Sequence, residues 1–166
     1  MKALILIDFE NEWANEKSDD YLGELSGLIR KTNNLIDFCR NKNYKIIFTR
    51  HVENGNWSEK SNGSKIIGEI HLKKNDKIIK KNRISPFYKT SLEKELNGIK
   101  EIVVCGILTN LCVRSLVQDA YDRGFKITVI KDCCKTYNQK THIFTINDLK
   151  ATRREIDFLN LKEFVN

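Results

Sequence analysis

Short apolar runs bounded by polar residues recur along the chain and predict β-strands. The runs ALILI at 3–7 and EIVVCG at 101–106 are apolar on both faces, which is typical of central strands in a parallel sheet. Further strands are predicted by YKIIFT at 44–49, DKIIK at 76–80, KITVI at 126–130 and EIDFL at 155–159.

Between these runs, apolar residues recur every three to four positions, which predicts amphipathic helices. The predicted helices cover 22–39, 91–99, 113–121 and 138–151. Strands that alternate with helices indicate an α/β fold with right-handed crossovers. We therefore expect one domain over residues 1–166, a doubly wound, mostly parallel sheet of about six strands with helices on both faces. Such a domain is a Rossmann-like three-layer sandwich, here with an excursion loop at 50–75.

Composition narrows the class of protein. The chain has 166 residues, 40% apolar and 31% charged, with a formal net charge of +7. The lysines are scattered apart from one denser run at 73–83, so we expect a small-molecule partner rather than nucleic acid. No apolar run approaches the roughly 20 residues that a membrane span needs. No signal peptide is apparent, and we expect a cytoplasmic protein that binds no membrane.

The five cysteines do not form a disulfide or zinc pattern. Their number is odd and no C-x-x-C pair exists, which favours reduced thiols. Cys39 and Cys105 fall on apolar positions of a helix and a strand, so we expect them in the core. A bridge between adjacent Cys133 and Cys134 would close a strained ring, and a structural role is favoured for both.

Chemistry-bearing residues follow three of the predicted strands. In open α/β sheets, ligands bind outside the carboxyl ends of the strands. Asp8 follows the first strand, Lys81 the third, and Cys112 lies shortly after the fourth. Asp8 is either the cap of a local turn or a general acid and base. Lys81 has several lysine neighbours, and only its place at a strand end separates it from a surface lysine.

Cys112 has two interpretations. If Thr109 or Asn110 caps the following helix, Cys112 lies in the first helical turn. Free N–H groups and the helix dipole favour a thiolate there, and the same N–H groups can stabilise an oxyanion. A packed structural thiol is the other interpretation. His142 falls inside the last predicted helix, where a structural role is favoured.

Three segments in this order resemble the isochorismatase-like cysteine hydrolase family, which includes nicotinamidases and related amidases. DFENEW is similar to the family's D-x-Q-N-x-F, with Glu10 in place of glutamine and Trp13 in place of phenylalanine. KNRISPFYKT is similar to K-x-x-x-S-A-F followed by threonine, with Pro86 in the alanine position. GILTNLCV is similar to G-x-x-T-x-x-C-V. Asp132 and His142 also fit the family's C-terminal segment.

The resemblance implies a mechanism and its residues. Cys112 would be the nucleophile, Asp8 the base that activates it, and Lys81 their electrostatic partner. The backbone N–H groups of Leu108 and Cys112 would form the oxyanion hole beside a non-proline cis peptide at Ile107–Leu108. The substrate would be a small amide or related C–N compound cleaved through a thioester, with no cofactor. Family members commonly form dimers or tetramers, so we expect a homo-oligomer.

Departures from the family pattern leave some questions open. Metal-dependent nicotinamidases carry an Asp/His cluster after the second strand, whereas here only His51 and Glu53 are present. We expect no metal, and assign Trp13, His51 and Trp57 to substrate binding, with core or interface positions as the alternative. Nicotinamidase, pyrazinamidase and isochorismatase-type activities stay open, as does a non-catalytic binding role. Glu10 reaches the site only if the chain turns after the first strand.

Overall fold

A six-stranded parallel sheet forms the centre of the protein. The computed structural model describes all 166 residues. The chain order of the strands is β1 Lys2–Ile7, β2 Lys45–His51, β3 Lys77–Lys81, β4 Glu101–Ile107, β5 Lys126–Lys135 and β6 Asp157–Leu159. The α-helices are α1 Ser26–Asn41, α2 Leu92–Glu95, α3 Arg114–Asp122, α4 Gln139–Thr152 and α5 Leu161–Val165. Short 3₁₀ turns η1 and η2 cover Asn11–Ala14 and Gly55–Trp57, and a π-helical turn η3 covers Thr109–Val113.

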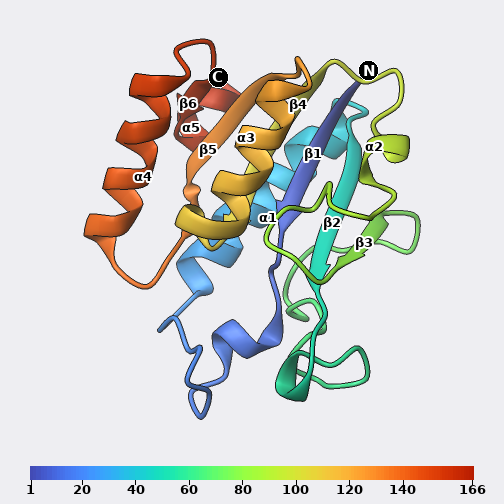
Figure 1. Cartoon of the computed structure of the whole chain (residues 1–166), viewed down its shortest axis with the longest axis vertical. Helices are drawn as coiled ribbons and strands as arrows, with labels where there is room; N and C mark the ends of the chain where they lie inside the picture. Colours follow the sequence, from blue (N-terminus) through green and yellow to red (C-terminus); the bar gives the residue numbers. More distant parts are fainter.

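The strands lie in the order β3-β2-β1-β4-β5-β6, and all neighbouring pairs are parallel. This is the doubly wound arrangement, in which the chain reverses its direction of travel between β1 and β4. The predicted mostly parallel sheet is therefore confirmed, and every strand in it is parallel. In Figure 1 the strands run downward from the N-terminal end of β1, so their carboxyl ends lie together at the bottom.

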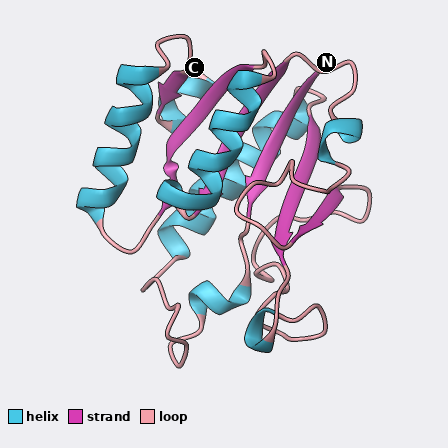
Figure 2. Ribbon diagram, in the orientation of Figure 1, coloured by secondary structure: helices cyan, strands magenta, loops and turns pink.

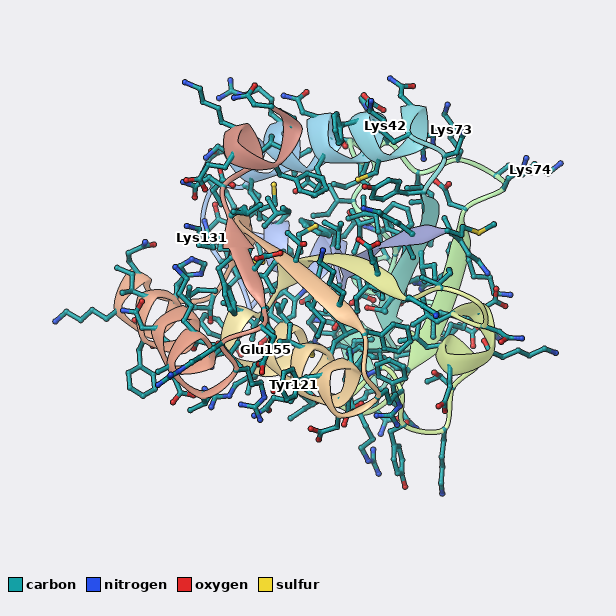
Figure 3. All side chains as sticks on the ribbon, turned by 90° about the horizontal axis from the view of Figure 1, so that it is seen from above. Lys42, Lys73, Lys74, Tyr121, Lys131 and Glu155 are labelled. Carbon is teal, nitrogen blue, oxygen red and sulfur yellow. The ribbon has the colours of Figure 1, made fainter.

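Helices cover both faces of the sheet. Helices α1 and α5 pack on one face, where both contact β5. Helices α3 and α4 lie on the other, and Figure 3, looking along the sheet, shows the sheet between these two layers. Strand β1 is buried from Ala3 to Ile7, which explains why its sequence is apolar on both faces. None of the helices combines the length and apolarity needed to cross a membrane.

The predicted elements are confirmed, with shifted ends. Strand β5 continues to Lys135, five residues beyond the predicted run, because its far half pairs with the end of β4 after a register shift. Helix α2 is a single turn rather than the nine-residue helix expected. Helix α5 was not predicted, since its five residues are too few for a periodic pattern.

The excursion loop between β2 and β3 packs along the segment that follows β1. The Asn11 N–H donates to the Lys65 carbonyl at 2.9 Å, and the Ile67 N–H donates to the Phe9 carbonyl at 3.0 Å. Both segments lie below the carboxyl ends of the strands in Figures 1 and 2, which colour them by sequence and by secondary structure. These two stretches of irregular chain therefore enclose the edge of the sheet at which chemistry was expected.

Strands β1 and β4 approach each other most closely at Gly106. This residue pairs with Ile7 and has φ of +143°, a conformation that L side chains rarely adopt. A Cβ atom built here would overlap the Ile7 backbone. Backbone rather than a flexible side chain blocks the space, so the chain requires glycine one residue before the end of β4.

We expect Gly106→Ala to lower the free energy of unfolding by about 2–4 kcal/mol, because it adds both backbone strain and a clash. Urea denaturation of the two proteins measures the difference. Gly68→Ala is the control, since no atom lies within 4 Å of a Cβ there, and should change stability by less than about 0.5 kcal/mol. Equal denaturation midpoints for the two variants would contradict the close approach.

Candidate active site

Three strands bring Asp8, Lys81 and Cys112 into one cluster. Asp8 directly follows β1, Lys81 is the last residue of β3, and Cys112 lies in η3, after β4. The Lys81 Nζ atom lies 2.7 Å from Asp8 Oδ2 and 3.3 Å from Cys112 Sγ. The structure thus brings together all three residues that the strand ends and the resemblance singled out, although β2 separates the two strands that carry the ion pair.

The lysine and the aspartate form a buried ion pair. The side chains of Lys81 and Asp8 are 0% and 1% exposed. Burial by itself lowers the pKa of Lys81, but the Asp8 charge and the hydrogen bonds to Asp8 and Cys112 outweigh it and leave the pKa raised. Lys81 is therefore a cation at neutral pH although, unlike the solvated lysines around it, its side chain is buried. Burial without a partner would cost several kcal/mol, so the two charges depend on each other.

The Cys112 thiol is protonated in the resting protein. Burial raises its pKa to about 12, the Asp8 charge adds to the rise, and Lys81 opposes it. The condition set for a helical cap is not met: neither Thr109 nor Asn110 is a cap, because both lie inside η3, whose N-cap is Leu108 and which leads into α3. A thiolate here must therefore be generated by a base rather than maintained by a helix terminus.

The turn that carries Cys112 is anchored from its outer side. Thr109 Oγ1 lies 2.9 Å from Nδ1 of His142 in α4, and Thr136 Oγ1 donates to Asn110 Oδ1 at 2.6 Å. The structural role predicted for His142 is thus a contact with this turn. These bonds explain why the two polar side chains expected as caps point elsewhere, and sequence spacing gives no signal for them.

Two neighbours orient Asp8. Thr49 of β2 donates its hydroxyl to Asp8 Oδ1 and accepts from the Asp8 N–H at 3.2 Å. Trp13 Nε1 donates to the Asp8 carbonyl at 2.8 Å, so the aromatic ring packs beside the cluster. Asp8 has φ of +51°, and the chain turns sharply at this point. Sequence analysis missed Thr49, since a threonine in an apolar strand carries no distinguishing pattern.

His51 borders the cluster as well. Its Nδ1 lies 3.2 Å from Lys81 Nζ, and its Nε2 lies 3.1 Å from Glu53 Oε1. A ring nitrogen beside a buried ammonium is a poor metal ligand, because a divalent cation would meet a positive charge at that distance. No group of three or more His, Cys, Asp or Glu residues in the structure has the arrangement of a metal site. The residues present do not fit a zinc centre.

The backbone beside Cys112 carries a donor without a partner. The peptide bond Ile107–Leu108 is cis, as the resemblance implies. The Leu108 N–H donates to no other backbone group, whereas the Leu108 carbonyl accepts from Leu111 and Val113. A free N–H on the chain just before Cys112 is available for an oxygen of a bound molecule.

Glu10 does reach the site, because the chain turns after Asp8. The side chain is fully buried, and its Oε2 accepts from the His51 N–H at 3.1 Å, while Oε1 has no partner. Burial, and next the Asp8 charge, raise the pKa of Glu10 well above its ordinary value. Only one buried lysine serves two carboxyl groups here, so Glu10 holds a proton and resembles the glutamine that it replaces.

We expect Glu10→Gln to change how stability depends on pH. The folded-state pKa is raised, so the unfolded chain releases the Glu10 proton first as pH rises, and folding becomes less favourable until the folded pKa is reached. Glutamine removes this loss. The variant should therefore gain about 1–3 kcal/mol relative to the parent protein between roughly pH 5 and pH 9.

Urea unfolding at several pH values tests this expectation. Glu16→Gln is the matched control, since Glu16 is an exposed carboxylate on the same segment and its removal should leave the pH dependence unchanged. Parallel curves for Glu10→Gln and the parent protein would mean that Glu10 is ionised in the folded state.

Comparison with known proteins agrees with this architecture. The chain matches the family model described as the isochorismatase domain over residues 2–156. It is 30% identical to nicotinamidase 3 of Arabidopsis thaliana, an alignment that covers 89% of this chain and 79% of the relative. A protein of the same plant named probable inactive nicotinamidase is 24% identical, with 89% and 87% covered.

Solved structures are similar along nearly their whole length. An isochorismatase-like hydrolase from Alkaliphilus metalliredigens superimposes with a TM-score of 0.88 at 23% identity, covering 99% of this chain and 96% of that one. The pyrazinamidase of Pyrococcus horikoshii in complex with zinc superimposes with a TM-score of 0.83 at 25% identity, covering 96% and 98%. With its sheet order, its strand-end residues and a family match over almost all residues, this chain belongs to the isochorismatase family of hydrolases.

Proposed function

We propose that this protein hydrolyses the C–N bond of a small amide, with Cys112 as nucleophile, Asp8 as base and Lys81 as their electrostatic partner. The observation that carries the proposal is the position of the Lys81 ammonium, 2.7 Å from Asp8 and 3.3 Å from Cys112. A buried cation in contact with both a carboxylate and a thiol stabilises the negative charge wherever it resides between them. That arrangement has an evident use in thiol activation and little use as packing.

The first half of the reaction forms a thioester. Asp8 accepts the Cys112 proton as the sulfur attacks the amide carbonyl carbon, so the charge moves from carboxylate to sulfur and then to the carbonyl oxygen. When the tetrahedral intermediate collapses, the C–N bond breaks and Asp8 returns the proton to the leaving nitrogen. Ammonia or an amine departs, and the acyl group stays on Cys112.

The second half restores the enzyme. Asp8, again a carboxylate, removes a proton from a water molecule that attacks the thioester carbonyl. The C–S bond breaks, the carboxylic acid is released, and the proton held on Asp8 returns to Cys112. Lys81 keeps its charge throughout, which is consistent with its raised pKa.

The developing oxyanion requires donors beside the sulfur. We assign the Leu108 and Cys112 N–H groups to this role, because Leu108 N–H has no backbone partner and Cys112 N–H belongs to the same turn. A preorganised donor of this kind typically contributes about 10²–10³-fold in rate.

The aromatic residues near the cluster favour a small, flat substrate. Trp13 contacts Asp8 through its indole N–H, and Trp57 packs on Trp13 with ring centroids 4.7 Å apart. The ring centroids of His51 and Trp57 are 6.0 Å apart, so these rings form one wall beside Lys81. The relative named nicotinamidase supports a planar amide as substrate, and metal coordination by His51 is not part of the proposal.

We expect Cys112→Ala to lower amide hydrolysis by roughly 10⁴-fold or more, since it removes the nucleophile. Ammonia release from an amide panel that includes nicotinamide and pyrazinamide provides the measurement. Cys39→Ala is the control, because Cys39 is a buried thiol of α1 remote from the strand ends, and it should retain activity. Full activity of Cys112→Ala would refute the thioester route, and an inert parent protein would favour a binding role.

Activity should also survive removal of divalent metals. His51 faces the Lys81 ammonium and lacks two further ligands, so chelation has no required ion to remove. Assays before and after dialysis against EDTA, and with added zinc, should agree within about twofold, with metal content measured in parallel. Loss of activity on chelation that zinc restores would show that the hydrolysis depends on a metal.

A further inference from the structure

An aromatic cluster made of Trp13, Trp57 and Tyr137 gathers three segments that are distant in sequence. Trp13 lies in η1, Trp57 in η2, and Tyr137 in the turn between β5 and α4. The centroid of the Trp13 ring is 4.7 Å from that of Trp57 and 6.4 Å from that of Tyr137. Backbone hydrogen bonds join the η1 segment to the loop that carries Trp57, whereas side chains join the Tyr137 segment to both.

One carboxylate connects the two outer rings. Asp20 Oδ2 accepts from Trp57 Nε1 at 3.0 Å, and Asp20 Oδ1 accepts from the Tyr137 hydroxyl at 3.1 Å. Asp20 belongs to the long connection between η1 and α1. It is not one of the three residues Asp8, Lys81 and Cys112, which we call the triad. Burial, and next the Asp20 charge, raise the pKa of Tyr137 to about 12, so the phenol remains a donor at neutral pH.

The aromatic cluster contacts the triad and its neighbour His51. Trp13 donates to the Asp8 carbonyl, and Trp57 packs on His51, whose Nδ1 is 3.2 Å from Lys81 Nζ. The segment of Tyr137 is bonded to the Cys112 turn through Thr136 and Asn110. Trp13 and Trp57 are therefore linked to the site by direct contacts, and Tyr137 through the residue that precedes it.

The outer side of Tyr137 faces open space. Tyr137 lines a surface hollow of about 700 Å³ together with Thr136 and His142, which both contact the Cys112 turn. The residues that line this hollow do not include Asp8, Lys81 or Cys112. A substrate-sized space thus borders residues that contact the Cys112 turn.

We propose that Asp20 is a positioning residue. By accepting hydrogen bonds from both Trp57 and Tyr137 it holds the two rings together, an arrangement that we call the clasp, and thereby limits the size of the molecules that reach Cys112. Release of either hydrogen bond lets Tyr137 or Trp57 move aside and widens the approach to Cys112. Size selection on the proposed amide substrate rests on the proposed function, whereas access to the Cys112 thiol does not. Asp20 touches neither substrate nor reacting atoms, and acts only through the two rings.

Alkylation of Cys112 tests the clasp without any substrate. Second-order rate constants are measured for iodoacetamide and for the bulkier N-phenylmaleimide, with mass mapping to assign the modified cysteine. Asp20→Ala should react about tenfold faster with N-phenylmaleimide, which is the effect of losing one or two charge-assisted hydrogen bonds on a closed population. The increase with iodoacetamide should be smaller, because a small reagent needs less opening.

Matched variants separate the clasp from general loosening. Asp19→Ala removes the same charge from the exposed neighbour of Asp20 and should react as the parent protein does. Tyr137→Phe keeps the ring, removes one donor, and should give an intermediate rate even if Asp20→Ala folds poorly. Acrylamide quenching of tryptophan fluorescence should increase in Asp20→Ala and not in Asp19→Ala.

Equal N-phenylmaleimide rates for Asp20→Ala, Tyr137→Phe and the parent protein would overturn the clasp. So would an equal acceleration with both reagents, since that result indicates unfolding rather than size selection. Failure of the proposed function has a different signature: Cys112→Ala would keep amidase activity while the alkylation rates still depend on Asp20.

Discussion

The buried ion pair between Lys81 and Asp8 is the interaction on which the site depends. Both side chains are almost fully excluded from solvent, and each charge is tolerable only because the other is present. Their strands, β3 and β1, are separated by β2, so the ion pair spans β2. Thr49 of β2 donates its hydroxyl to the Asp8 carboxylate. This geometry concentrates one positive charge beside the Cys112 sulfur, at a place where water is too scarce to screen it.

The balance of buried charge also decides the state of Glu10. A second ionised carboxylate would leave the buried cluster with more negative than positive charge, so Glu10 keeps its proton and accepts a backbone N–H instead. His51 meets Lys81 through a ring nitrogen, and that contact makes the position unsuitable for a cation. Burial and the Asp8 charge thus determine the protonation of Glu10, and the lysine determines the coordination chemistry of His51.

The topology of the sheet brings Asp8 and Cys112 together. Because β1 and β4 are adjacent and the chain leaves them toward opposite faces, their carboxyl ends border the crevice where Asp8 and Cys112 meet. The irregular segments after β1 and β2 then cover this edge and bring an aromatic cluster to it. A rigid sheet therefore holds the reactive groups, while loops joined by side-chain hydrogen bonds surround them.

The sequence by itself determined the sheet, the longer helices and three residues at or after strand ends. Apolar periodicity follows directly from burial, and Asp8, Lys81 and Cys112 follow or end such runs. It did not reveal Thr49, Asp20 or Tyr137, whose contacts join segments 37 to 117 residues apart. Nor did it indicate that η3 replaces a capped helix, or that Glu10 is buried. Those features arise where side chains from separate elements meet, and local pattern carries no information about which donor will find which acceptor. Tertiary structure decided them, because burial of a charge or a hydrogen-bonding group can be satisfied only by the partners that the fold brings to it.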